Sequence, residues 1–375
     1  MFQFPVQPDH YPVCAVQSMT KSLSVAISLF LFLGSLPGQK GGFKIEVEHP
    51  RLPSVSQGRT GTCWSFATTS FVESELERLH GAPVNLSEIH TVYYAYIEKA
   101  RRYVRLHGKT QFDEGGLCHD VMYLIDKYGV VPQAAFTGLC EGDKGHNHGE
   151  MVDLLKIVVE KVAKSPRPSQ KWESAVRGML EGYLGPVPDA IEVHGKNVTP
   201  KEYARKVLKI KSEDYCQIMS LEGQRFWKTA ELLVPDNWMR HQGYWNVPIA
   251  TMMKALDHAV RKGFTVAVDI DVSEPTTRGY VWTMPKLQEK TGAITDKMRQ
   301  KMFDDRSTTD DHLMHIVGIA RHKDGRTFYL TKDSIGQRGP FKGHRMISTN
   351  YLMAKMLSFM VHKDGIESKL TKRFK

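Results

Sequence analysis

The sequence has no apolar run long enough for a comfortable membrane span. Its most apolar stretch, residues 23–36, falls short of the roughly 20 residues that a spanning helix needs. It follows Lys21 and ends just before Gly38, which is typical of a secretory signal peptide. We therefore interpret residues 1–38 as upstream residues and a signal peptide, with Met19 as the true start and cleavage near Gly38. An uncleaved anchor is the alternative.

Cysteine is also scarce, with 5 residues in 375, and this excludes a disulfide-rich scaffold. Cys63, Cys118, Cys140 and Cys216 follow the predicted signal peptide. Export to the periplasm or the extracellular space would place them in an oxidising compartment, where cysteines pair. If Cys63 is kept free for chemistry, at most one disulfide can form among the other three, and the sequence leaves that pairing open.

Runs of one charge, low-complexity segments and internal repeats are absent as well. The 51 Lys and Arg outnumber the 41 Asp and Glu, but the net charge of +10 is spread along the chain. A solvated basic surface explains this best, and a weak, salt-sensitive affinity for polyanions is the alternative. A hydrophobic fraction of 41% indicates a globular protein and excludes a disordered chain.

Helical patterns fill the first two thirds of the chain, and strand patterns follow. The expected helices cover residues 63–80, 87–106, 117–128, two stretches within 150–183, a start at 199–200, and 249–262. The expected strands cover residues 264–270, 312–320, 326–332 and 356–362, which are rich in β-branched and aromatic side chains. Helices first and strands last predict an α+β fold with two unlike halves. Catalytic sites commonly lie in the cleft between such halves.

Cys63 stands at the start of the first expected helix, in the stretch QGRTGTCWSFATTSFVESELERLHG. Apolar residues recur there at helical spacing, with Glu73 and Glu77 turned elsewhere, so we expect an amphipathic helix. Unpaired N–H groups and the helix dipole favour a thiolate at a helix N-terminus. Cys63 is therefore a candidate nucleophile, and a buried structural cysteine is the alternative.

A thiolate nucleophile needs a base that a third group orients. His312 begins an apolar strand after a polar loop, where a side chain can project from the end of a sheet. His315 lies three residues further along, faces the other side, and is expected in the core or on the surface. Asp333 ends the next strand and could accept a hydrogen bond from the far nitrogen of His312. These three positions predict a Cys63–His312–Asp333 site.

Several motifs together resemble the papain superfamily of cysteine peptidases. They are Gln57 six residues before the cysteine, GTCWSF, GG at 115–116, and DH–strand–KDSIG. The run FDEGGLCHDVMYLIDKYGVVPQ is most similar to the bleomycin hydrolase, or aminopeptidase C, branch. The resemblance implies a papain-like fold with a helical lobe and an antiparallel, β-barrel-like lobe.

The spacing of the motifs supports that branch. In papain-type enzymes the histidine follows the cysteine by roughly 130–150 residues. Here 249 positions separate Cys63 from His312, so an insert of about 100 residues is expected. We place it at about 134–244, as an additional helical subdomain within one peptidase domain of residues 39–375.

The resemblance also implies roles for the matched residues. Cys63 would be the nucleophile, His312 the general acid and base, and Gln57 an oxyanion donor, with no metal or cofactor. Gly115 and Gly116 would contact a peptide substrate, with a tight turn as the alternative. Trp64, the remaining candidate at the substrate site, is expected to serve packing more than chemistry.

The branch further implies aminopeptidase-like activity and a homo-oligomer. The departure lies in KDSIG, which stands where N-S-W-G is usual and puts Asp333 at the Asn position and Ile335 at the Trp position. An Asp can accept the same bond and should raise the pKa of His312. A catalytically impaired relative that acts as a binding protein is the alternative.

Overall fold

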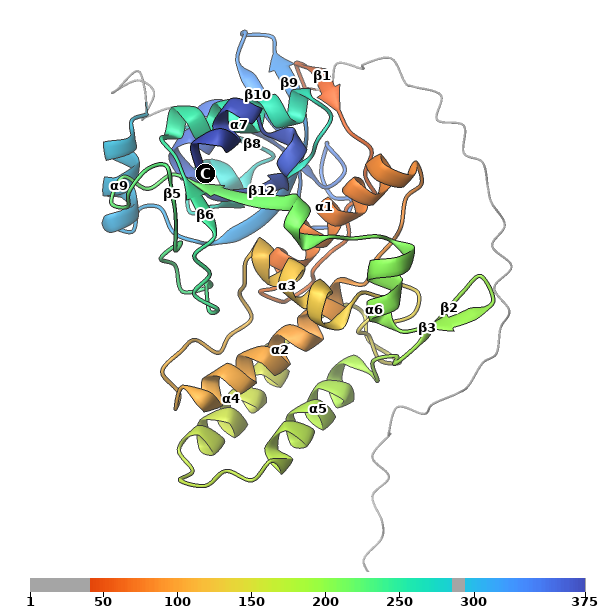
Figure 1. Cartoon of the computed structure of the whole chain (residues 1–375). Helices are drawn as coiled ribbons and strands as arrows, with labels where there is room; N and C mark the ends of the chain where they lie inside the picture. The colour runs from red at the N-terminus through yellow and green to blue at the C-terminus, as the bar shows by residue number, and fades with distance from the viewer. Residues whose placement is uncertain (1–40, 285–293, 375) are drawn as a thin grey trace, which may run out of the picture.

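The computed structural model describes residues 41–284 and 294–374 (Figure 1). The predicted signal peptide lies outside these residues, so export stays a prediction. Among the described residues, no helix is long and apolar enough to cross a membrane.

The first half of the chain is helical, as predicted. Its helices are α1 (Cys63–His80), α2 (Glu88–Arg105), α3 (Cys118–Tyr128), α4 (Gly149–Ala163), α5 (Lys171–Leu184) and the short α6 (Pro200–Glu202). The ends follow from local chemistry: the Ser87 hydroxyl accepts the N–H of His90 at 3.0 Å and caps α2. Gly81 ends α1 with a φ of 74°, which few other residues adopt easily.

The second half, together with β1 from near the start of the described chain, forms a large sheet (Figure 1). Its strands are β1 (Phe43–Glu48), β4 (Tyr215–Met219), β5 (Lys228–Ala230), β6 (Tyr244–Asn246), β7 (Val266–Ile270), β8 (Val281–Trp282), β9 (His312–His322), β10 (Thr327–Lys332), β11 (His344–Ser348) and β12 (Met356–His362). The order is β5-β6-β4-β12-β7-β9-β10-β11-β8, with β1 also on β9. Most pairs are antiparallel, but β4–β6 and β8–β11 are parallel.

Further helices accompany the sheet. They are α7 (Ile249–Arg261), α9 (Asp296–Asp304), α10 (Thr349–Lys355) and α11 (Ser368–Thr371). The apolar side chains of α7, including Met252 and Leu256, are buried in one cluster with β7, β9 and β12. A second cluster joins α1–α5. The α+β fold with two unlike lobes is therefore confirmed.

The predicted insert at 134–244 is helical only in part. The helices α4 and α5 and a small hairpin of β2 (Ile191–Val193) and β3 (Lys196–Val198) occupy its first part. Its last part contributes β4, β5 and β6 to the main sheet, next to β12. Strands β5 and β6 have three residues each, too short for an apolar alternation to show in the sequence.

Helix α1 is not amphipathic, which corrects the sequence analysis. Every residue from Cys63 to Leu76 is buried, because α1 packs against β7 and β9 on one side and α2 and α3 on the other. Glu73 is buried too, and accepts the N–H of Leu86 at 2.9 Å. Burial raises its pKa to about 8. The helix that begins at Cys63 is thus the wall shared by both lobes.

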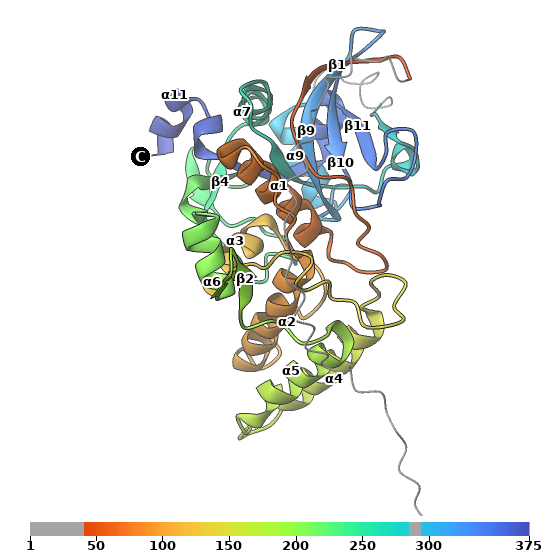
Figure 2. The same ribbon diagram turned by 90° about the vertical axis from the view of Figure 1, so that its right-hand side faces the viewer.

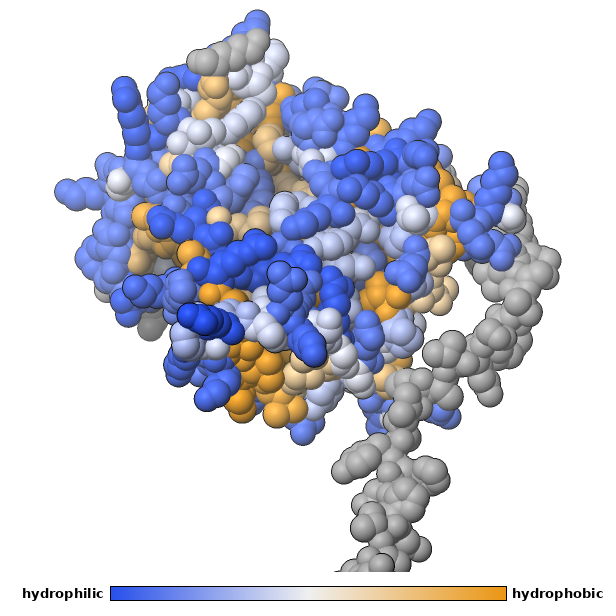
Figure 3. Space-filling model, turned by 60° about the horizontal axis from the view of Figure 1, so that its bottom comes forward, coloured by the Kyte–Doolittle hydropathy of each residue, from blue (hydrophilic) through white to orange (hydrophobic). Residues whose placement is uncertain are grey.

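The helical end of the molecule exposes apolar side chains, whereas residues near the C-terminus pack against the sheet. Figure 3 brings the end opposite the sheet forward, and apolar patches appear there among hydrophilic surface. On α4, Leu154 and Ile157 are exposed. At the C-terminal end, Phe374 stacks on Trp245 with ring centres 4.6 Å apart. Figure 2 shows this end across the molecule from β10.

Candidate active site

Cys63 is the first residue of α1, as predicted. Thr62 precedes the helix without a side-chain cap, and no acidic residue stands in the first turn, so nothing local neutralises the helix N-terminus. The Cys63 side chain is nearly buried, at 8% exposure. It therefore lies below the surface at the start of α1, where the helix dipole favours a negative charge.

His312 and Asp333 meet at neighbouring strand ends. His312 opens β9 and Asp333 directly follows β10, its antiparallel partner. His312 Nε2 lies 2.8 Å from Asp333 Oδ1. The structure therefore brings together the two residues that the sequence predicted as partners.

His312 also lies close enough to Cys63 for the charges of the two side chains to interact. Since Asp333 occupies Nε2, the other ring nitrogen, Nδ1, is the one left for Cys63. Burial opposes a charge on this ring, but the interactions with Cys63 and the hydrogen bond to Asp333 outweigh it and raise the pKa of His312 to about 10. An imidazolium is therefore favoured beside Cys63 over the neutral pH range.

Gln57 lies at the same site, held by a clamp between two distant segments. Its N–H donates to Ser334 O at 3.0 Å, and Gly336 N donates to Val55 O at 3.1 Å. Its side-chain Oε1 accepts the Ser334 hydroxyl, and Nε2 donates to Thr60 O at 2.6 Å. One N–H of Nε2 is left for a ligand. The clamp thus fixes Gln57 relative to His312.

A cavity of about 480 Å³ opens beside this clamp. Its lining includes Gln57, Arg59, His312, Ile335 and Arg338. Ile335, at the position where the resemblance implies Trp, therefore forms part of the wall. The cavity gives a substrate access to the His312 side of the site.

Arg345 is the residue at this site that the sequence analysis missed. It lies on β11, paired with Thr331 of β10, and its Nε donates to Asp333 Oδ2 at 2.9 Å. The two oxygens of Asp333 are thus shared between His312 and Arg345. Only the register of β10 against β11 reveals this contact, and the sequence carries no motif for it.

Gly116 packs against Trp64, the neighbour of Cys63, and close contacts within the protein explain why positions 115 and 116 are glycines. A Cβ on Gly115 would lie 2.0 Å from the carboxylate of Asp236, and one on Gly116 would lie 2.8 Å from that of Asp120. Trp64 is 1% exposed and donates from its indole to Glu114 O at 2.9 Å. Trp64 thus supports the glycine loop from beneath and does not line a surface.

The other predicted histidine and cysteine positions are structural. His315 is fully buried and bonds the Ser70 hydroxyl at 2.9 Å, so the core prediction is confirmed. Burial raises the pKa of Cys118 and of Cys216 to about 12, and neither forms a disulfide. Within residues 41–284 and 294–374, no group of three His, Cys, Asp or Glu could hold a metal ion.

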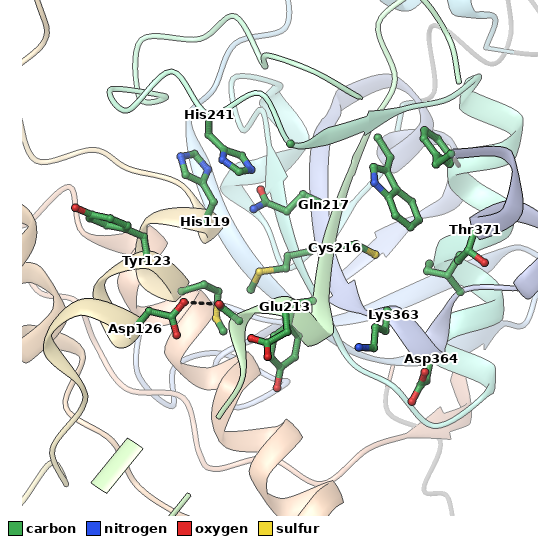
Figure 4. A pocket seen from close by; sticks show the side chains of 18 of the residues that line it. His119, Tyr123, Asp126, Glu213, Cys216, Gln217, His241, Lys363, Asp364 and Thr371 are labelled. Atoms are coloured by element: carbon green, nitrogen blue, oxygen red, sulfur yellow. Dashed lines mark hydrogen bonds between the residues drawn. The ribbon is translucent and has the colours of Figure 1, made fainter. Parts of the chain in front are cut away.

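A larger cavity, about 1100 Å³, lies away from these groups (Figure 4). Its walls come from α3, β4, β12 and the C-terminal helix, and include His119, Gln217 and Lys363. Cys63, His312 and Asp333 are not among its lining residues. The volume of a cavity alone therefore does not locate the chemistry.

Comparison with known proteins agrees with this geometry. No protein-family profile matches the chain. It is 20% identical over 358 residues to aminopeptidase G of Lactobacillus delbrueckii, covering 84% of this chain and 82% of that protein. To aminopeptidase C of Listeria monocytogenes it is 20% identical over 361 residues, covering 85% and 82%. A viral cathepsin of Choristoneura fumiferana nuclear polyhedrosis virus is 27% identical over 166 residues, 42% of this chain and 43% of that protein.

The solved structure of PepW from Lactobacillus rhamnosis superposes with a TM-score of 0.70 at 17% identity, covering 88% of this chain and 84% of that one. The fold is papain-like. The predicted resemblance to the papain superfamily and its aminopeptidase C branch is confirmed. The names of these relatives imply a cysteine-type peptidase, which is a hydrolase.

The environment of the cysteines predicts selective alkylation. At pH 6, iodoacetamide should modify Cys63 well before Cys118 or Cys216, because an imidazolium faces only Cys63 while burial keeps the other two thiols protonated. Peptide mapping by mass spectrometry after short exposure measures this. A Cys63→Ser variant controls for labelling elsewhere, and equal modification of Cys118 would contradict the expectation.

Proposed function

We propose that the protein is a thiol peptidase that hydrolyses peptide bonds through Cys63, His312 and Asp333, with an aminopeptidase-like preference. One observation carries the proposal: His312 is hydrogen-bonded to Asp333, which directly follows β10, and lies close enough to Cys63 at the start of α1 for their charges to interact. This is the arrangement of nucleophile, base and orienting group that acyl transfer needs.

The chemistry follows from these positions. The Cys63 thiolate attacks the carbonyl carbon of the scissile bond, and the negative charge moves to the carbonyl oxygen. The free N–H of Gln57 Nε2 and the backbone N–H of Cys63 stabilise that oxygen. His312 then gives its proton to the leaving amine as the C–N bond breaks. A water then attacks the thioester while His312 takes its proton, the acid is released, and the thiolate–imidazolium pair is restored.

Two buried carboxyl groups support a preference for a free amino terminus. Asp269 on β7 is fully buried and close enough to Cys63 and to Asp310 for their charges to interact. Neither Asp269 Oδ1 nor Asp310 Oδ2 has a hydrogen-bond partner in the part of the chain that the structure describes. Burial raises the pKa of Asp310 to about 8. An ammonium group of a substrate would supply the missing donors.

The alternative function, a catalytically impaired relative that binds without cleaving, has no support from these contacts. That alternative was based on Asp333 and Ile335, which stand where the family pattern has Asn and Trp. Asp333 nevertheless bonds His312 as an orienting group would. Export and assembly into a homo-oligomer stay predictions.

Replacing the nucleophile tests the proposal most directly. Cys63→Ser should abolish hydrolysis of aminoacyl and peptidyl amides, because a hydroxyl has no comparable anion at neutral pH, while the nearly isosteric change preserves the fold. Circular dichroism checks the fold, and a fluorogenic amide assay measures the activity. The wild type should also form a covalent adduct at Cys63 with an epoxysuccinyl peptide. Wild-type protein that neither cleaves nor labels would refute the function.

Loss of the Gln57 amide should act on the rate more than on binding. Gln57→Ala is expected to lower kcat by roughly 10²-fold with a smaller effect on KM, because the amide donates to an oxyanion that exists only in the transition state. Steady-state kinetics separate the two constants. An increase in KM alone would instead identify Gln57 as a residue that binds the ground state.

Asp310 and its neighbour Asp311 form a matched pair for testing the amino-terminal preference. Asp310→Asn should raise KM about tenfold for peptides with a free amino terminus and leave N-acetylated peptides unaffected, because a charge-assisted bond is lost. Asp311 already accepts bonds from Thr309 at 2.7 Å and Val272 at 3.1 Å, so Asp311→Asn is the control. Equal effects on both kinds of peptide would exclude recognition of the terminus here.

A further inference from the structure

Asp333 lies where its full negative charge would slow proton transfer from His312 in the proposed reaction. A carboxylate 2.8 Å from His312 Nε2 stabilises the imidazolium. That imidazolium must release its proton to the leaving amine, and a more basic ring is a poorer acid. An amide at this position would orient the ring without adding charge. Efficient proton transfer therefore requires another group that weakens the effect of the Asp333 charge on His312.

Arg345 is positioned to weaken this effect. Its guanidinium lies on the far side of the carboxylate, with Nε donating to Oδ2 while Oδ1 faces His312. Both side chains are largely out of water, at 13% exposure for Arg345 and 3% for Asp333. Water therefore screens the interaction little, and the ion pair is stronger than one on an open surface.

Arg345 is itself held in one orientation. Its Nη1 donates to Gly279 O at 3.0 Å, and its guanidinium lies 4.7 Å from the ring centre of Tyr280 and 5.6 Å from that of Trp282. These contacts hold the guanidinium by cation–π attraction in addition to its hydrogen bonds. The guanidinium also covers Asp333 Oδ2, so it excludes water from a carboxylate that Ile335 alone would shield poorly.

We propose that Arg345 is a positioning residue of the site: it holds and partly neutralises Asp333, so that Asp333 orients His312 much as a neutral amide would. Asp333 and Arg345 thus form one functional unit. The inference rests on the proposed function, because it concerns proton transfer by His312, but it can be measured without a peptide substrate.

Other charged groups near the site do not take this role. Cys63 faces His312 from α1, and Asp269 on β7 interacts with Cys63, not with Asp333. Arg59 and Arg338 line the neighbouring cavity, and no hydrogen bond links either side chain to Asp333.

The strand neighbours of Asp333 and Arg345 are also engaged elsewhere. Burial lowers the pKa of His344 to about 4, and its Nε2 accepts a bond from Arg51 at 2.8 Å. Lys332 Nζ donates to the Ser70 hydroxyl at 2.7 Å. Among these groups, the charge that reaches Asp333 directly besides His312 is that of Arg345.

The proposal predicts opposite shifts for the two single variants. In Arg345→Met, the uncompensated charge of Asp333 should stabilise the imidazolium. The alkaline limb of the kcat/KM profile should then move to higher pH by about one pH unit, with kcat lowered and KM unchanged. In Asp333→Asn, the unpaired guanidinium should move that limb down. The double variant, with an amide and no cation, should recover toward the wild type in both the alkaline limb and kcat. Arg345→Lys, which keeps the positive charge, should keep the alkaline limb near its wild-type pH.

Two measurements distinguish this test from that of the function. The pH dependence of Cys63 alkylation by iodoacetamide reports the thiolate–imidazolium pair with no substrate, and kcat and KM report the reaction. Wild-type protein that alkylates but does not cleave amides would refute the function and leave the Arg345 test intact. Arg321→Met, which removes an exposed pair with Glu46, is the matched control for loss of an arginine on the sheet.

The outcomes decide the proposal. Opposite limb shifts with recovery in the double variant support it. If Arg345→Met lowers the melting temperature and the activity at all pH values but leaves both limbs unmoved, Arg345 is only structural and the proposal is wrong. Should Arg345→Met fail to fold, the comparison of Asp333→Asn with the double variant decides, and a double variant no more active than Asp333→Asn overturns the proposal.

Discussion

The burial of α1 between the two lobes is the constraint on which the rest of the structure depends. Along the buried part of α1, from Cys63 to Leu76, bonds from neighbouring elements stabilise polar side chains, because an unpaired polar group costs free energy there. Ser65 donates to Glu88 O of α2, and Ser74 donates to Pro50 O beside the sheet. These bonds tie α1 to both lobes. Cys63, at one end of this fixed helix, therefore has a defined position relative to both.

The sheet side of the site depends on a second constraint, the clamp between residues 54–57 and 333–336. Ser54 donates to Asp333 O at 2.6 Å, and Asp333 N donates to Gly343 O at 3.0 Å. The segment that leads into α1 is thus fastened to the end of β10. Because one segment carries both Gln57 and the approach to Cys63, the clamp sets the oxyanion donor, the nucleophile and the orienting carboxylate together.

The sequence predicted those parts of the fold whose signal is local. The start of α1 at Cys63, the Ser87 cap and the strand that begins at His312 were all readable from turn residues and apolar periodicity. The buried Glu73 was misjudged because a carboxylate normally marks a solvent face, and only its bond to the Leu86 N–H explains its burial. The short strands β5 and β6 carry too little pattern to be seen.

Arg345 was missed for a different reason. Its contact with Asp333 depends on the register between β10 and β11, two strands that a long loop separates in the sequence. The pattern of residues within either strand does not indicate this register. Asp333 alone therefore looked like a departure that could impair the site. Once the arginine is placed, the same aspartate becomes half of a buried ion pair whose net charge is close to that of an amide. A substitution at a catalytic position can thus be judged only with the residue that the fold brings against it.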